Sequence, residues 1–293
     1  MNMKKNVLVG FLVVALAVAS GCCSCGCGCR GERPNISVFA HYVKDIAKQR
    51  QVSLTEAANM LYDIGVRGFD IGPREEELPE LAASKLKPIN FYFFPNFYAA
   101  DNGAADIRFC LDQAEKYGVP RVMVVPSNFT KDGDQEAEFA KSLRGMKLFV
   151  AEAKKRGITI TVEDFGGTKN PCSYAKYLKR FLDEIPELKF ALDSGNMYYA
   201  SRGEDILEMM AYAKGRIGHV HLKDQTKDDH HVYAELGLGG VPNEQVVKGV
   251  NAAGYDGWYT LENTVRGADV YYEAVRQVAV LKAWLRESSE ARR

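Results

Sequence analysis

The sequence predicts an α/β protein, a single closed (β/α)8 barrel, from three observations. Strand and helix patterns alternate without a break from Pro34 onward, and most connections between them are short. Eight βα units suit a chain of 293 residues, because such a barrel takes about 250 residues. Several strands are apolar on one face and polar on the other, as expected when helices cover the outside and the interior carries chemistry.

The eight units follow one another along the chain. Strands are expected at residues 36–41, 66–71, 88–94, 122–126, 158–163, 190–193, 218–223 and 259–262. Helices are expected at residues 53–64, 75–85, 104–117, 135–156, 173–184, 204–214, 246–253 and 269–287. A capping box from Ser53 to Glu56 opens the first helix. The long connection 224–240 is expected at the catalytic face, as a lid or rim.

The most informative strand is Gly218-His219-Val220-His221-Leu222-Lys223-Asp224. Its side chains alternate, so Val220 and Leu222 face outward while His219, His221 and Lys223 face the barrel interior.

Three other strands end their inward rows in a carboxylate: Glu163, Asp193 and Glu262. Together with His221 they supply the ligand types that a hard or borderline divalent cation accepts. A single inward carboxylate can instead pair with a cation or cap a helix. Four such residues at the carboxyl ends of barrel strands favour a metal site, because that face is the catalytic one.

Other side chains near the strand ends are candidates for binding substrate. Lys223 points into the mouth and suits a substrate hydroxyl or oxyanion, although a solvated rim lysine fits the pattern equally well. His41 and Asp70, near the ends of the first two strands, are candidates for the same mouth, with a structural role as the alternative. His219 lies one layer below His221, where a supporting role is expected.

The N-terminus predicts export. Lys4 and Lys5 precede an apolar run from Val7 to Ala19, which is typical of a signal peptide over residues 1–21 and too short to span a membrane. Ala19-Ser20-Gly21-Cys22 resembles a bacterial lipobox, which predicts lipidation at Cys22 and anchoring to the cell envelope, periplasmic or surface side. Cleavage as a plain signal peptide is the alternative.

Residues 22–34 form a Cys/Gly-rich tether, and residues 35–293 are assigned to the barrel. The tether lacks paired C-x-x-C spacing, so a linker is favoured over a soft-metal site. Without residues 1–21 the chain has 36 basic and 38 acidic residues. It therefore lacks the excess of basic residues expected of a protein that binds the phosphate backbone of nucleic acids. The membrane is expected as a partner only through the lipid anchor. The sequence is compatible with a homo-oligomer.

Four segments resemble the xylose-isomerase-like, or sugar isomerase/epimerase, TIM barrels. They are Val162 to Phe165, Leu192 to Asn196, His219 to Asp224, and Gly237 to Gly239 with the later stretch from Gly254 to Glu262. In members such as D-tagatose 3-epimerase, Glu, Asp, His and Glu at four successive strand ends bind one Mn²⁺, Mg²⁺ or Co²⁺. The matching residues here are Glu163, Asp193, His221 and Glu262, spaced by 30, 28 and 41 residues.

The resemblance implies a metal-dependent isomerase or epimerase acting on a small sugar. Glu163 and Glu262 would then serve both as ligands and as the acid and base that move a proton beside a carbonyl. Zinc fits this oxygen-rich set less well. One departure is Asn196, which stands where the epimerases often carry a substrate-binding His; Asn can still hydrogen-bond a sugar hydroxyl. Export favours a non-phosphorylated sugar or an oxidised glycoside.

Parts of the sequence also fit three other functions. A base beside a carbonyl can also drive β-elimination from a keto-glycoside, and a barrel of this kind can bind sugar without catalysis. Asp228-Asp229-His230-His231 resembles a motif of the zinc-dependent AP endonucleases of the same superfamily. Those enzymes need further histidines, and the chain has only 5. That shortage and the neutral charge argue against DNA repair.

Overall fold

The computed structural model describes residues 34–200 and 205–290. The leader and the tether up to Arg33 lie outside the described residues, so the lipidation site at Cys22 stays a prediction. Among the helices in the described part of the chain, none is both long and apolar enough to cross a bilayer.

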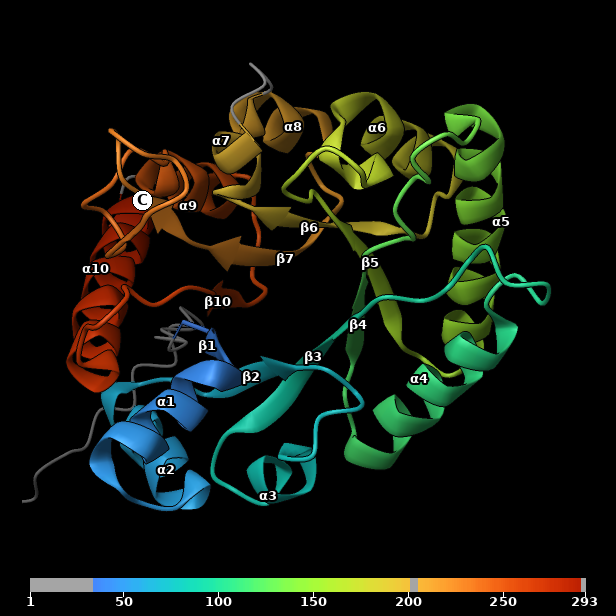
Figure 1. Ribbon diagram of the computed structural model, residues 1–293. Coiled ribbons are helices and arrows are strands. Elements are labelled where there is room, and N and C mark those ends of the chain that lie inside the picture. The colour runs from blue at the N-terminus through green and yellow to red at the C-terminus, as the bar shows by residue number, and fades with distance from the viewer. Residues whose placement is uncertain (1–33, 201–204, 291–293) are drawn as a thin grey trace, which may run out of the picture. The chain divides into compact units, whose positions relative to one another are not determined.

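Eight parallel strands close into a barrel, in the order β1, β10, β7, β6, β5, β4, β3, β2 around the ring (Figure 1). This arrangement confirms the predicted (β/α)8 fold. The barrel strands are β1 (Ile36–Phe39), β2 (Gly68–Ile71), β3 (Lys87–Phe93), β4 (Arg121–Val124), β5 (Thr159–Glu163), β6 (Lys189–Asp193), β7 (Ile217–Leu222) and β10 (Tyr259–Leu261).

Helices surround this ring on the outside (Figure 1). They are α1 (Ala40–Arg50), α2 (Leu54–Ile64), α3 (Leu78–Ala82), α4 (Ala104–Tyr117), α5 (Gln135–Lys155), α6 (Ala175–Glu184), α7 (Asn196–Ala200), α8 (Ile206–Tyr212), α9 (Asn243–Ala252) and α10 (Val270–Glu290), with a short 3-10 turn at Pro171–Ser173.

The predicted capping box forms at the start of α2. The Ser53 hydroxyl accepts from the Glu56 N–H at 3.2 Å, and the Glu56 carboxylate accepts from the Ser53 N–H at 2.9 Å. Gly65 ends the helix with a φ of 111°, a left-handed conformation that favours glycine. Sequence and local structure agree at both ends of this helix.

The first strand is shorter than predicted, and a helix was missed. β1 ends at Phe39 and α1 begins at Ala40, so His41 lies in the first turn of a helix and not at a strand end. Phe39 is the N-cap residue and makes no side-chain cap hydrogen bond. The helix start therefore lacks the polar capping residue by which sequence patterns reveal such boundaries.

The alternating pattern of β7 has the predicted orientation. Val220 and Leu222 are buried in the apolar layer between the strands and the helices. Burial of such side chains stabilises the fold by about 1.5–3 kcal/mol each. His219 and His221 face the interior instead, where both contact Asp70 of β2 across the barrel. The wall is thus held by apolar packing outside and polar contacts inside.

The Asp224 carboxylate holds the connection after β7 in place through hydrogen bonds. This connection contains a small antiparallel pair, β8 (Asp224–Gln225) and β9 (Tyr233–Ala234). The Asp224 carboxylate accepts from the backbone N–H groups of Gln225, Gly237, Gly239 and Val241, at 3.0, 2.9, 3.0 and 3.1 Å. A Cβ on Gly239 would lie 2.2 Å from Asp224 Oδ1, so this close approach requires glycine.

Candidate functional site

Four side chains of types that can bind a metal meet at the carboxyl ends of adjacent strands. Glu163 and Asp193 are the last residues of β5 and β6, His221 lies in β7, and Glu262 follows β10. The four strands β5, β6, β7 and β10 are neighbours in the ring (Figure 1). The two glutamates therefore come from the outer strands of this arc, with Asp193 and His221 from the strands between them. One ligand atom from each residue lies within 4.8 Å of the others. The fold therefore brings the predicted set together.

The imidazole of His221 presents one nitrogen to this cluster. Its Nδ1 lies 2.6 Å from Glu163 Oε1 and 3.3 Å from Glu262 Oε2. Its Nε2 points the other way, 3.0 Å from Asp70 Oδ2. A carboxylate on one ring nitrogen fixes the orientation of the ring and leaves the other nitrogen for a metal.

Asp70 lies beneath the cluster and is not exposed at the mouth. Its Oδ2 accepts from Asn90 Nδ2 at 2.7 Å and contacts His219 Nε2 at 2.8 Å. The carboxyl is fully buried, which raises its pKa, yet His219 and His221 hold that pKa far below its usual range. The Oδ2 atom of Asp70 is therefore shared among Asn90, His219 and His221, and its Oδ1 accepts from the Thr260 hydroxyl.

Lys223 is enclosed by carboxylates. Its side chain is 7% exposed, and its Nζ lies 2.6 Å from Glu262 Oε1, 3.0 Å from Asp193 Oδ2 and 3.2 Å from Asn196 Oδ1. A solvated rim position is thereby ruled out. Burial lowers the pKa of Lys223, but the neighbouring carboxylates raise it well above its ordinary value.

The two glutamates differ in their electrostatic surroundings. Burial raises the pKa of Glu163, only partly offset by His221. Burial also acts on Glu262, but Lys223 and His221 outweigh it and hold the pKa of Glu262 well below its usual range. The pKa values of the two glutamates are therefore shifted in opposite directions.

A divalent cation fits this set of donors. Three carboxylates and one imidazole are a ligand set for Mn²⁺, Mg²⁺ or Co²⁺. Glu262 Oε2 lies 3.3 Å from His221 Nδ1, and Asp193 Oδ2 lies 3.0 Å from Lys223 Nζ, without a hydrogen bond of good geometry to either oxygen. Both oxygens are therefore available to a bound cation.

Aromatic rings form a wall beside the cluster. Phe39 packs edge-on against His221, with ring centroids 5.0 Å apart, and stacks on Tyr92 at 5.3 Å. Phe94 packs edge-on against Phe165 at 6.1 Å and is 55% exposed. Tyr92 lies in β3, and Phe94 directly follows it. Phe39 carried no distinguishing sequence signal, because an aromatic residue at a strand end is commonly part of the core.

Asn196 and His41 have different surroundings. Asn196 is 8% exposed; its Nδ2 donates to the Asp164 carbonyl at 2.7 Å and its Oδ1 accepts from Lys223. His41 is partly buried, with its ring 5.1 Å from that of Tyr42, and burial lowers its pKa. Asn196 therefore adjoins the cluster, whereas His41 stands on α1 above β1.

Tyr233 lies in the hairpin after β7 and is 41% exposed. Partial burial raises its pKa, and the charges of Lys223, Glu262 and Asp193 also act on it. No sequence motif marks this residue. The signal available was its position in the long connection, nine residues after Asp224.

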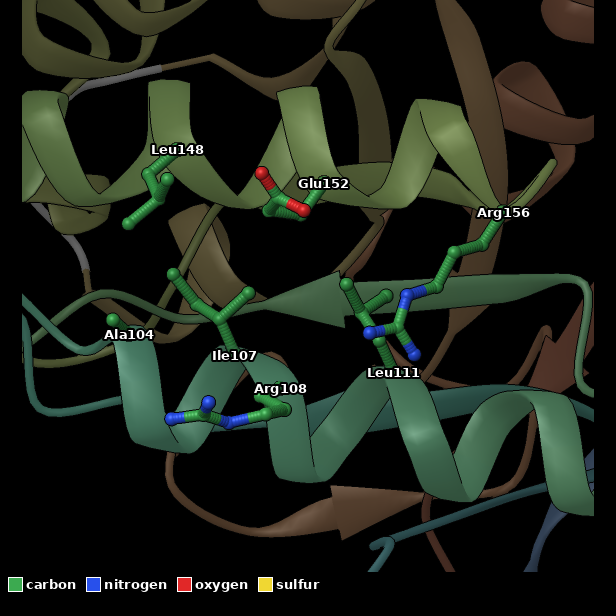
Figure 2. Close-up of a pocket in the computed structure, with 7 residues that line it drawn as sticks. All are labelled: Ala104, Ile107, Arg108, Leu111, Leu148, Glu152 and Arg156. Carbon is green, nitrogen blue, oxygen red and sulfur yellow. The ribbon is translucent and has the colours of Figure 1, made fainter.

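A groove of about 250 Å³ lies on the outside of the barrel, between α4 and α5 (Figure 2). Its lining residues are Ala104, Ile107, Arg108, Leu111, Leu148, Glu152 and Arg156. All seven come from these two helices or the residue after α5, and none comes from a barrel strand. The groove is separate from the cluster of strand-end ligands.

The geometry agrees with the family identified by sequence. The family model described as xylose isomerase-like TIM barrel matches residues 51–288. The chain belongs to this family. No curated protein matches the chain by sequence.

Solved structures of this xylose isomerase-like fold resemble the chain over most of its length. A D-psicose 3-epimerase from Clostridium cellulolyticum H10 is 16% identical, with a TM-score of 0.66 over 86% of this chain and 99% of its own. A 3-keto-D-glucoside 4-epimerase from E. coli is 15% identical, with a TM-score of 0.67 over 86% and 99%. A probable 3-DHS dehydratase from Bacillus anthracis is 15% identical, with a TM-score of 0.68 over 85% and 98%. Identities this low show a common fold and no more.

Proposed function

We propose that the protein is a divalent-metal-dependent sugar isomerase or epimerase. It moves a proton at the carbon next to a carbonyl of a non-phosphorylated sugar or sugar derivative. The observation that carries the proposal is the convergence of Glu163, Asp193, His221 and Glu262, with one ligand atom of each within 4.8 Å of the others. Sugar epimerases among the solved structures of the same fold support the choice of substrate class.

These four residues would hold the metal, with His221 binding through Nδ1 because Asp70 occupies Nε2. When bound, a divalent ion supplies polarisation of a carbonyl and charge stabilisation beside it. The remaining chemistry belongs to the chain. Asp70 keeps the His221 ring in place, and the Phe39 ring packs edge-on against that imidazole.

Glu163 and Glu262 carry the proton transfer in this proposal. They come from the two ends of the four-strand arc, so a substrate carbon between them has a carboxylate on each side. One glutamate, as the carboxylate, takes the proton from the carbon next to the carbonyl, and the other, as the carboxylic acid, delivers its own proton to the opposite face.

The substrate is a free sugar or an oxidised glycoside in this proposal. Lys223 is already engaged by two carboxylates, so it is poorly placed to neutralise a phosphate as well. The E. coli structure named for a 3-keto-D-glucoside adds an oxidised glycoside to the substrates worth testing. The proposed export through Cys22 points the same way, because sugar phosphates are intracellular.

The test uses protein loaded with Mn²⁺, Mg²⁺ or Co²⁺ and a panel of ketoses and keto-glycosides. NMR measures whether each sugar is converted. Glu163→Gln and Glu262→Gln should each lower turnover by about 10²–10⁴-fold at saturating metal, because general acid–base groups contribute that much. Glu76→Gln, an exposed position on the connection after β2, is the matched control. An unsaturated product would establish β-elimination instead, and sugar binding without conversion would establish the binding-protein alternative.

The endonuclease alternative gains nothing from the structure. The groups of metal-binding side chains in the described residues include neither His230 nor His231. Their rings pack against Tyr198 and Tyr199, with centroids 4.2 and 4.4 Å apart. Stoichiometric binding of three zinc ions per chain would be required to revive it.

A further inference from the structure

The ammonium group of Lys223 lies inside the ligand cluster, and the surrounding backbone is built to keep it there. The Lys223 N–H donates to Ser194 Oγ at 3.2 Å, and its carbonyl accepts from Asn243 Nδ2 at 3.0 Å. A Cβ on Gly195 would lie 2.4 Å from Lys223 Cγ. The missing side chain at Gly195 therefore gives the lysine stem its path toward Asp193 and Glu262.

Asp193 has one oxygen left for a cation. Its Oδ1 accepts from the N–H groups of Gly195 and Asn196, both at 2.8 Å. Its Oδ2 is the remaining atom, and Lys223 Nζ stands 3.0 Å from it. The oxygen that a metal would need is thus the oxygen that the lysine already contacts.

The two carboxylate oxygens of Glu262 face different groups. Its Oε1 lies 2.6 Å from Lys223 Nζ, while its Oε2 faces His221 Nδ1 at 3.3 Å. Glu163 is the third carboxylate of the cluster, and all three are largely removed from water. Buried carboxylates need a nearby positive charge, because isolated buried charges are costly. In the protein without metal, Lys223 provides that charge.

We propose that Lys223 is an internal counter-cation that competes with the divalent metal for Asp193 and Glu262. The inference rests on the proposed metal centre and adds a residue that opposes metal binding. Two cations on the same carboxylates repel each other, so the lysine weakens metal binding. In return it offsets the carboxylate charges when the metal is absent, which keeps the metal-free barrel folded and the metal exchangeable.

The test is the dissociation constant of Mn²⁺, measured by electron paramagnetic resonance of free Mn²⁺ at fixed pH and ionic strength. Lys223→Met should bind Mn²⁺ at least about tenfold more tightly than the wild type, because a close positive charge is removed from a poorly screened site. Lys223→Arg keeps the charge and should not tighten binding.

Lys189→Met is the matched charge control. Lys189 begins β6 and Asp193 ends it, which separates them by about 13 Å at the usual rise of a strand. That exceeds the screening length of about 8 Å in physiological salt, so the dissociation constant should stay within about twofold of the wild type. The inference would be overturned if the Lys223→Met variant is folded but binds Mn²⁺ no more tightly than the wild type. Wild-type protein that binds no divalent metal would instead overturn the proposed function.

A second measurement guards against a variant that is poorly folded without metal. Removing the lysine charge leaves three buried carboxylates together, so metal-free Lys223→Met and Lys223→Gln should melt below the wild type. Saturating Mn²⁺ should then raise the melting temperature of both variants by more than it raises that of the wild type, because tighter binding to the folded state stabilises it further. An equal or smaller rise would contradict the competition.

Discussion

Asp70 Oδ2 lies 3.0 Å from His221 Nε2, on the side of the imidazole opposite the nitrogen that faces Glu163. The two residues are 151 positions apart and come from β2 and β7, which are not neighbours in the ring. The contact therefore crosses the barrel interior. It fixes which nitrogen of His221 is available to a metal, and so links a fully buried carboxylate to the proposed chemistry.

Asp70→Asn should weaken metal binding by about 10–100-fold while the four proposed ligands remain in place, because losing a carboxylate partner frees the imidazole to rotate and makes it less basic. The measurement is a calorimetric titration with Mn²⁺. Asp63→Asn, at an exposed position of α2, is the control and should bind like the wild type. Unchanged affinity in Asp70→Asn would show that His221 does not depend on this contact.

The sequence predicted the barrel and the four clustered residues because both follow from local patterns. Alternation along a strand determines which side chains face inward, and the carboxyl ends of parallel strands meet at one end of a barrel. These two rules were sufficient to predict that Glu163, Asp193 and His221 lie close together. The roles of the four residues remain predictions, since their geometry alone does not test catalysis.

Other features depend on contacts that no local pattern contains. Asp70 resembled a mouth residue because it precedes the end of its strand, but its partners come from β3, β7 and β10. The burial of Lys223 depends on Gly195, which lies in a different βα unit. The helix α1 was missed for a different reason, because it begins at Ala40 and Phe39 before it provides no side-chain cap. The first two features are tertiary effects that outweigh the local signal, and the third is a local signal that is missing.

Asp224→Ala should loosen residues 225–241 without unfolding the barrel. The substitution removes an acceptor shared by four backbone N–H groups, so these amides lose their partners together. Hydrogen–deuterium exchange at Gly237, Gly239 and Val241 should accelerate by at least about tenfold. Asp229→Ala in the same connection, where the carboxylate accepts from the His231 N–H, is the control and should leave those three amides protected. Unaltered exchange in Asp224→Ala would mean that the connection is held elsewhere.

Glu273 makes stability depend on pH. It is fully buried on α10, accepts from the Val265 N–H at 3.0 Å, and burial raises its pKa to about 7. Because the pKa in the folded protein exceeds that of the unfolded chain, near 4.5, the folded state binds the proton more tightly. This contribution to stability is complete below about pH 4.5 and is lost as the pH rises through about 7.

The free energy of unfolding of Glu273→Gln relative to that of the wild type should therefore be larger at pH 8.5 than at pH 5, by up to about 3 kcal/mol. Urea unfolding at the two pH values measures the difference, and any constant effect of the substitution cancels. Glu76→Gln, at an exposed position, should show no such trend. A wild type that gains stability over Glu273→Gln as the pH rises would reverse the predicted sign.

The proposed lipid anchor has a direct test in cells. Mass spectrometry of the mature protein should find an acylated Cys22 at its N-terminus, because the residues before it resemble a lipobox. Cys22→Ser should move the protein from the membrane fraction to the soluble fraction, whereas Cys25→Ser in the tether should not. An unprocessed N-terminus retained in the cytoplasm would refute export.

The most direct measurement is solvent deuterium incorporation during turnover in D₂O by the metal-loaded protein, followed by NMR. Proton transfer through Glu163 and Glu262 predicts deuterium at the carbon next to the carbonyl of the converted sugar, because carboxylic acids exchange their protons with solvent. Product formed with no deuterium at that carbon would indicate transfer of hydrogen within the substrate. That result would contradict the central claim that these two glutamates move the proton.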